Sequence, residues 1–146
     1  MPPSSLLKTH YFDELHVGMT ATMQREVAEA DVTHFANVSG DYNPLHIDPE
    51  FAAKTIFGGC ITHGMLTASY ISAVFAMQLP GPGAVYVSQS LNFRGPVRVG
   101  DTVTTKVTIA DLYPAKRRAL FDCECTVDGK AVLAGEAILM VPTRDS

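Results

Sequence analysis

Residues 64–78 have the sequence GMLTASYISAVFAMQ, a stretch without a single charged side chain. A helix that is apolar on nearly every face lies buried inside a protein. The stretch therefore predicts one buried helix over residues 64–78. Residues 80–83, Pro-Gly-Pro-Gly, end this helix because neither residue type continues a helix well.

Segments typical of β-strands surround the predicted helix. Residues 21–27 before it, which include Thr22 and Val27, favour a first strand, and the strand-like segments after it are 85–93, 103–109, 121–127 and 131–141. Apolar and polar residues alternate in 85–93, 103–109 and 121–127, which is typical of antiparallel strands with one buried face, and Asp128-Gly129 predicts a tight hairpin turn. A curved antiparallel sheet wrapped around the helix would bury it, so we expect an α+β fold.

Length and composition limit the classes of protein that are possible. The 146 residues are the size of one domain, so we expect a single domain over 1–146, with 1–11 as an irregular arm. A formal net charge of −4 excludes general binding to nucleic acid or to an anionic membrane surface. Hydrophobic residues make up 47% and charged residues 18%, which excludes disorder and suggests that a partner subunit covers some apolar surface.

The sequence also predicts a cytoplasmic location. We expect no secretory signal, because the N-terminus lacks a long apolar segment, and no apolar run reaches the roughly 18 residues of a membrane span. Cys60, Cys123 and Cys125 are an odd number and too few for a disulfide framework. Cys123 and Cys125 fit small hydrophobic positions in a half-buried strand, so we expect reduced thiols.

The run Asp41-Tyr42-Asn43-Pro44-Leu45-His46 contains a candidate acid–base pair. It follows a segment of helical spacing over 29–38, which Gly40 ends, and precedes a short helix expected over 48–54. Pro44 keeps Asn43 out of the helical region, which predicts an extended or turned segment. Singly, Asp41 could cap a turn, Asn43 could form an Asx-turn and His46 could be a partly buried histidine; as a pair, Asp41 and His46 favour chemistry.

His63 and Gly64 stand where the predicted buried helix begins. The first backbone N–H groups of a helix have no intrahelical partner and lie at its positive end. They are natural donors to an oxyanion that develops during a reaction. Asp41, His46 and His63 could also bind a metal, but their spacing matches no common site, so we expect no metal.

The run FANVSGDYNPLH at 35–46, with Ala52 six positions later, resembles the signature of the MaoC-like (R)-specific enoyl-CoA hydratases, also called hydratase 2. The segments THGML at 62–66, VSQSLNF at 87–93 and PVRVGD at 96–101 resemble further parts of that family. The likeness runs from about Phe12 to Val141. It implies a hot-dog fold, a homodimer or higher homo-oligomer, and reversible hydration of a trans-2-enoyl thioester to an (R)-3-hydroxyacyl thioester.

The resemblance also implies roles for individual residues, without a cofactor. Asp41 is expected to be the principal base, and His46 to orient the water and to pass a proton to C2. The Gly64 N–H is expected to bind the thioester oxygen of an acyl-CoA. The residues expected to contact the substrate or to shape its site are Asn43, His63, Met65, Ser69, Arg94 and Arg98. The Ser69 hydroxyl could equally well bond to its own helix. The CoA phosphates need cations, for which Arg94, Arg98 and the run Lys116-Arg117-Arg118 are the candidates, although the run is more typical of a solvated turn.

Three other functions remain open at this stage. A hot-dog thioesterase would cleave the thioester, although the Asp41–Asn43–His46 spacing favours a hydratase. A dehydratase of (R)-3-hydroxyacyl-carrier-protein would share the chemistry and differ in the carrier. A non-catalytic subunit would complete a heterodimer, although the presence of both Asp41 and His46 argues against it.

Overall fold

The computed structural model describes residues 2–145 of the chain. Its regular elements, in chain order, are the 3₁₀ turns Ser4–Leu6 and Phe12–Glu14, strand β1 (Thr20–Glu26), helices α1 (Glu29–Ser39), α2 (Pro44–Ile47), α3 (Pro49–Ala53) and α4 (Gly64–Met77), strands β2 (Val85–Gln89), β3 (Asn92–Phe93) and β4 (Thr102–Tyr113), the 3₁₀ turn Pro114–Lys116, and strands β5 (Arg118–Val127) and β6 (Lys130–Met140).

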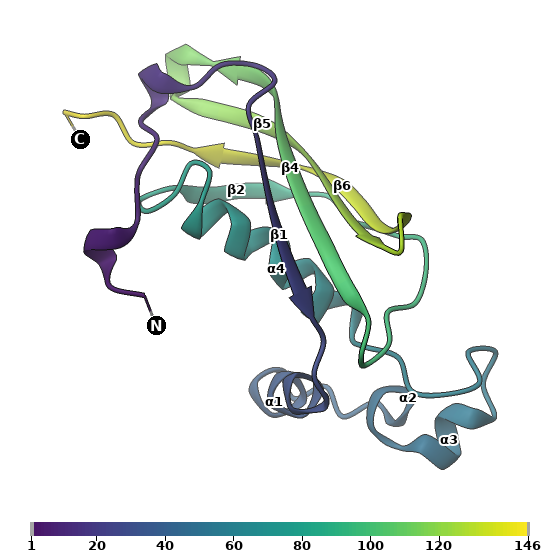
Figure 1. Ribbon diagram of the computed structural model, residues 1–146. Helices are drawn as coiled ribbons and strands as arrows, with labels where there is room; N and C mark the ends of the chain where they lie inside the picture. The colour runs from purple at the N-terminus through teal and green to yellow at the C-terminus, as the bar shows by residue number, and fades with distance from the viewer. Residues whose placement is uncertain (1, 146) are drawn as a thin grey trace.

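The strands form one antiparallel sheet (Figure 1). Its order is β1-β4-β5-β6-β2, and the short strand β3 also pairs with β6. In the turn between β5 and β6, Asp128 and Gly129 have φ angles of +50° and +79°, the positive values that a two-residue hairpin turn requires. The predicted antiparallel strands and the predicted hairpin are confirmed, with six strands in place of the five expected.

Helix α4 lies along the inner face of this sheet (Figure 1) and supplies much of the core. Ile71 and Val74 are fully buried, and the Phe75 ring packs edge-on against Phe121 of β5 with ring centroids 4.7 Å apart. The helix starts at the predicted residue and ends one residue before the predicted end. A sheet wrapped around one central helix is the α+β hot-dog architecture that the resemblance implies.

One stripe of α4 is not covered by the chain itself. Met65, Ser69, Ser72 and Ala76 are exposed, and their spacing places them on one face of the helix. The first three line a groove of about 520 Å³ that continues onto β2, where Tyr86 and Val87 complete it. We call this the α4–β2 groove. The expectation of a helix buried on nearly every face is therefore wrong for this stripe, because β2 is the last strand of the sheet and no strand among residues 2–145 pairs beyond it.

The structure differs from the sequence prediction in two further segments. Residues 85–93 form two strands in place of one, because the chain passes close over Gly135 of β6; a Cβ at Gly135 would overlap the Ser90 carbonyl. Residues 44–47 form a short helix in place of an extended segment, since Pro44 takes the first helical position, where the restricted φ of proline suits a helix. Asn43 itself is non-helical, with φ −53° and ψ 124°, as the proline predicts.

The N-terminal segment, expected to be an irregular arm, contains one 3₁₀ turn and then runs beside the end of α4. The His10 N–H donates to the Pro80 carbonyl at 2.7 Å, and the Thr9 hydroxyl donates to the Pro82 carbonyl at 2.9 Å. Within residues 2–145, none of the helices has the length and apolarity of a membrane span.

The cysteines are free thiols, as expected. Cys123 and Cys125 point inward from β5 and are buried, which confirms their reading as small hydrophobic residues of a half-buried strand. Burial raises the pKa of the Cys123 thiol to about 12 and shifts the pKa of Cys125 in the same direction. Neither thiol has the ionised form that metal binding or nucleophilic chemistry would need near neutral pH.

Candidate active site

The loop that carries Asp41 is held by its own side chains. Helix α1 ends at Gly40, whose φ of +80° is the left-handed conformation that favours glycine. The Asp41 N–H then donates to the Ser39 hydroxyl at 3.1 Å, and the Asp41 carboxylate accepts the Asn43 N–H at 3.2 Å. The Asn43 side chain in turn accepts the Leu45 N–H at 3.0 Å and caps α2. Asp41 is exposed, and its main chain is fixed on both sides.

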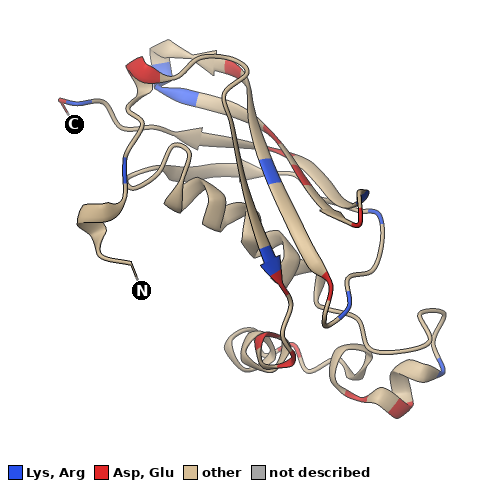
Figure 2. Cartoon of the chain, in the orientation of Figure 1, with Lys and Arg blue, Asp and Glu red and all other residues tan. Residues whose placement is uncertain are grey.

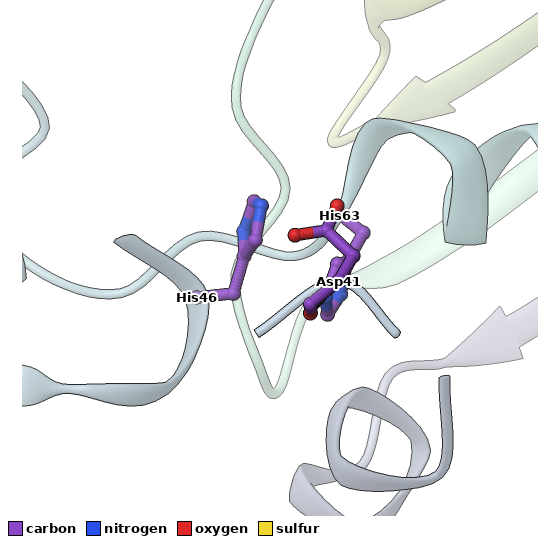
Figure 3. Close-up of side chains that lie close together, drawn as sticks. All are labelled: Asp41, His46 and His63. Carbon is purple, nitrogen blue, oxygen red and sulfur yellow. Dashed lines mark hydrogen bonds between the residues drawn. The ribbon is translucent and has the colours of Figure 1, made fainter. Parts of the chain in front are cut away.

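His46 lies in the last turn of α2 and is half-buried. Its Nδ1 is 2.8 Å from the carbonyl oxygen of Ile61. A carbonyl only accepts hydrogen bonds, so the proton of the neutral ring lies on Nδ1 and Nε2 is the acceptor. Figure 3 shows the Asp41 carboxylate turned toward this ring. The structure therefore presents one carboxylate and one unprotonated imidazole nitrogen side by side.

His63 precedes α4 and is 1% exposed. Its Nε2 is 3.0 Å from the Asp41 carbonyl oxygen and must donate to it, and its ring stacks on His46 with centroids 4.0 Å apart and planes at 28°. Phe35 of α1 packs on His63 at 4.9 Å. Two side chains of one segment, residues 41–46, and a third from a later segment thus meet in one cluster: an Asp41 oxygen and one nitrogen from each imidazole lie within 4.8 Å of one another (Figure 3).

This cluster does not have the geometry of a metal site. A metal would bind the imidazole lone pairs, which lie in the ring planes, at about 2.0–2.1 Å. The His46 and His63 rings are stacked, so their in-plane lone pairs do not converge on one point. The ring nitrogens His46 Nδ1 and His63 Nε2 are, in addition, already engaged by carbonyl oxygens.

The first turn of α4 offers unused hydrogen-bond donors next to the cluster. The His63 carbonyl accepts the N–H groups of Leu66 and Thr67. Within the described residues, the Gly64 N–H has no partner. Gly64 also lines a cavity of about 450 Å³ at the start of the helix, together with apolar side chains, the hydroxyls of Thr62 and Thr67, and Arg94. Both hydroxyls are buried and have no hydrogen-bond partner among the described residues, so they could still form hydrogen bonds.

The structure separates the two arginines that the sequence grouped together. Arg94 is exposed and lines the cavity. Arg98 donates from its guanidinium to the Phe57 carbonyl at 2.6 Å and thereby holds the loop that follows α3. The run 116–118 lies at the β4–β5 hairpin, at the opposite end of the sheet from α1, α2 and α3, as Figures 1 and 2 show. That run is remote from the Asp41 of its own chain.

Two further expected contacts are also placed by the structure. The Ser69 hydroxyl donates to the Leu66 carbonyl at 2.5 Å, so it bonds to its own helix, which is the alternative left open from the sequence. Met65 is 56% exposed and lies in the α4–β2 groove, while its neighbour Leu66 belongs to the core.

Sequence reasoning missed the groups that hold the pair in place. The Ile61 carbonyl sets the tautomer of His46, but a backbone oxygen has no sequence signature. Phe35 packs on His63, although its spacing in α1 indicates only a core-facing side. Thr62 and Thr67 lie on either side of His63-Gly64 in the sequence. Their position beside a predicted helix start was the one sequence feature that could have indicated polar groups in the cavity.

Comparison with known proteins places this arrangement in a family. The MaoC like domain matches residues 14–127, most of the chain. The chain belongs to the MaoC-like family. This MaoC-like chain is 50% identical over 139 residues to a 3-hydroxybutyryl-CoA dehydratase of Methylorubrum extorquens, which covers 95% of this chain and 88% of that protein. It is 49% identical over 135 residues to an (R)-specific enoyl-CoA hydratase of Rhodospirillum rubrum, covering 92% and 94% of the two chains.

A solved structure confirms the hot-dog fold of the MaoC-like chain. The R-hydratase of Pseudomonas aeruginosa in its unliganded form superposes with a TM-score of 0.88 at 40% identity, covering 93% of this chain and 88% of that one. The family and the fold expected from the 35–46 run are therefore both confirmed.

Proposed function

We propose that the protein is a hydro-lyase that adds water reversibly to trans-2-enoyl-CoA and forms (R)-3-hydroxyacyl-CoA. One observation carries the proposal: the Asp41 carboxylate faces a His46 ring whose Nε2 is an acceptor, beside the unused N–H of Gly64. The two relatives described above are named for a dehydratase and a hydratase of CoA thioesters, the two directions of this reaction.

Asp41 and His46 are spaced to hold one water molecule. A carboxylate oxygen and a ring nitrogen lie within 4.8 Å, and two hydrogen bonds of about 2.8 Å that meet at a water with a near-tetrahedral angle span about 4.6 Å. Both side chains are acceptors, so each takes one O–H of the water. The water lone pairs are then free to attack C3 of the enoyl group.

The hydration step balances within this pair. As the C3–O bond forms, one water proton passes to the pair, with Asp41 as the principal base, and the C2–C3 π electrons move toward the thioester carbonyl. His46 orients the water and passes a proton to C2, so the pair ends in its starting protonation state. General acid–base help of this kind accelerates a reaction by about 10²–10⁴-fold. The addition of water involves no net oxidation or reduction, so it calls for no redox cofactor.

The Gly64 N–H is proposed to bind the thioester oxygen. That oxygen becomes an enolate as water adds, and the N-terminus of the 14-residue helix α4 presents a donor and a positive dipole end to it. One such donor contributes about 3–4 kcal/mol to transition-state stabilisation in other enzymes.

The substrate is proposed to enter the cavity at the start of α4. Phe57, Phe93 and Val97 give it apolar walls, and the exposed Arg94 guanidinium at its edge suits the CoA phosphates. Asn43, Ser69 and Arg98 each bond to a loop or a helix of the protein, and we propose that they support the site through these bonds.

The working form is proposed to be a homodimer. Val85, Tyr86 and Val87 of the edge strand β2 are 40–50% exposed, and the α4–β2 groove beside them has no charged lining residue. A second copy would cover both. The free thiols of Cys60, Cys123 and Cys125 suit a reducing compartment, and we propose the cytoplasm.

Crotonyl-CoA tests the activity directly. We expect the purified chain to remove the conjugated absorbance of crotonyl-CoA and to form the (R)-3-hydroxy product, and we expect Asp41→Asn to lose at least about 10²-fold in kcat while keeping its thermal melt. The substitution is nearly isosteric and keeps the loop but removes the base. Equal turnover by Asp41→Asn and the parent chain would refute the assignment.

The same assay separates the other functions. Release of free thiol from acyl-CoA would indicate a thioesterase, and a preference for acyl-carrier-protein substrates would indicate a dehydratase of that carrier. Activity only after addition of a second, different chain would indicate a non-catalytic subunit. His46→Ala is expected to lose more than tenfold in kcat; a smaller loss would leave His46 a structural role.

A further inference from the structure

We propose that His63 is a positioning residue, which holds the Asp41 main chain and the His46 ring in their working geometry without touching the substrate. The inference deepens the proposed function and rests on it. It departs from the expectation that His63 binds substrate, because the ring is 1% exposed. Of the five histidines, His63 is the one that is fully buried.

Four segments of the chain meet at the His63 imidazole. The Nε2–H group donates to the carbonyl of Asp41, one face of the ring lies 4.0 Å from His46, and Phe35 packs on the ring at 4.9 Å. The residue itself caps α4. These contacts join α1, the Asp41 loop, α2 and the start of α4 through one side chain.

The backbone of His63 has a positioning role of its own. Its carbonyl accepts the N–H groups of Leu66 and Thr67 and so sets the first turn of α4. Gly64, which carries the proposed oxyanion donor, follows directly. A single residue therefore relates the positions of the base, the water-orienting ring and the oxyanion donor.

The unpaired atom of His63 shows which part of the ring is used. Nδ1 is buried and has no hydrogen-bond partner within the described residues, whereas Nε2 is engaged. The protein thus uses one donor of this side chain, its stack on His46 and its tilted contact with Phe35. One of the two ring nitrogens of this buried histidine therefore forms no hydrogen bond, which is uncommon for a buried polar atom.

Two substitutions separate the donor from the ring faces. His63→Gln keeps an N–H donor near the position of Nε2 and loses the flat ring. His63→Phe keeps the ring stack on His46 and removes the donor to Asp41. His63→Leu removes both, and His16→Ala, an exposed histidine in a turn away from the site, is the matched control.

Steady-state kinetics with crotonyl-CoA measure the effect. Misplacement of a catalytic group by about 1 Å costs on the order of 10²-fold, so we expect His63→Leu to lose about 10²-fold in kcat with KM within about threefold. His63→Gln and His63→Phe should each restore part of this loss. The proposal is overturned if His63→Gln and His63→Phe both keep kcat within twofold of the parent, or if KM rises while kcat is unchanged, which would indicate substrate contact.

An NMR measurement tests the contact without turnover. In protein labelled with ¹⁵N-histidine, His63→Gln should shift the ring resonances of His46, because the stacked ring is lost, and His16→Ala should not. Unchanged His46 resonances in His63→Gln would refute the proposal. If the parent chain hydrates no enoyl-CoA, the proposed function fails, and the His46 resonances still decide whether His63 holds that ring. If His63→Leu does not fold, His63→Gln and His63→Phe decide in both assays.

Discussion

Two carbonyl oxygens determine how the histidines of the site are protonated. Ile61 holds the proton of His46 on Nδ1, and Asp41 holds the proton of His63 on Nε2. The two stacked rings donate through different nitrogens, His46 through Nδ1 and His63 through Nε2. The remaining nitrogen of His46 is therefore an acceptor, on a ring that the Asp41 carboxylate faces. At the scale of single residues, the chemistry of the site depends on backbone atoms as much as on side chains.

The two arginines of the site should respond differently to removal. Arg94→Ala is expected to raise KM for crotonyl-CoA about fivefold at low salt with an unchanged thermal melt, because one exposed ion pair contributes about 1 kcal/mol. Arg98→Ala removes the bond to the Phe57 carbonyl and should lower the free energy of unfolding by about 1–3 kcal/mol. Kinetics at two salt concentrations and denaturant unfolding of both variants measure this contrast. A normal KM for Arg94→Ala at low salt would exclude Arg94 from CoA binding.

The residues of the site could be predicted from sequence where spacing alone carries the information. Asp41 and His46 stand five positions apart around a proline, and the structure brings them together. The position of His63 in the same cluster depends on a stack between α2 and the start of α4, and Arg98 differs from Arg94 only through its contact with a loop carbonyl. Such contacts between distant segments leave no local pattern in the chain.

Among the helices and strands, hydrophobic periodicity predicted those elements whose position in the sequence pattern depends on which side is buried. The charge-free run became α4, and the alternating segments became strands, because each pattern reports which side faces the core. Periodicity missed the break between β2 and β3, which comes from close packing of Ser90 over Gly135, and it missed α2, a single turn set by Pro44 and its cap. The first depends on a contact between distant strands, and the second on local backbone geometry.

The inward thiols of β5 make the fold sensitive to alkaline pH. The pKa of Cys123 is about 12 in the folded chain, against 9.0 for a free thiol. The unfolded chain therefore loses this proton first, so the stability contribution is complete below pH 9 and falls as pH rises toward 12. We expect the free energy of unfolding, measured by urea denaturation, to fall above pH 9 by up to about 1.4 kcal/mol per pH unit for this thiol.

Cys123→Ala provides the comparison for this prediction. The variant should be less stable at neutral pH because it leaves a cavity, yet its stability should fall less steeply between pH 9 and 11. Identical slopes for the variant and the parent would show that Cys123 does not contribute to the alkaline loss.

Across the whole molecule, the sheet has two edge strands, and exposed large apolar side chains gather at only one of them. Strand β1 lies at one edge, and β2 at the other edge presents half-exposed Val85 and Val87 beside the α4–β2 groove. A low content of charge had suggested covered apolar surface, and the structure locates that surface on β2 and on one stripe of α4. Exposed edge strands of this kind pair readily with a second chain.

Val87→Arg should disrupt the proposed homodimer. A charge on this half-exposed side chain of β2 would have to be desolvated in the interface, so we expect a monomer in light scattering after size exclusion. Val17→Arg, which changes a 58% exposed side chain in a turn, should leave the mass unchanged. A parent chain that is monomeric at micromolar concentration would contradict the prediction at once.

The Asp41 loop is ordered by bonds among its own residues, from Ser39 through Leu45. The conformational entropy of this segment is therefore lost when the chain folds, not when substrate arrives. Binding energy from the CoA moiety need not be used to order the catalytic loop. It remains available to bring C3 of the acyl group against the water, so specificity among acyl groups can be altered at the cavity walls without rebuilding the loop.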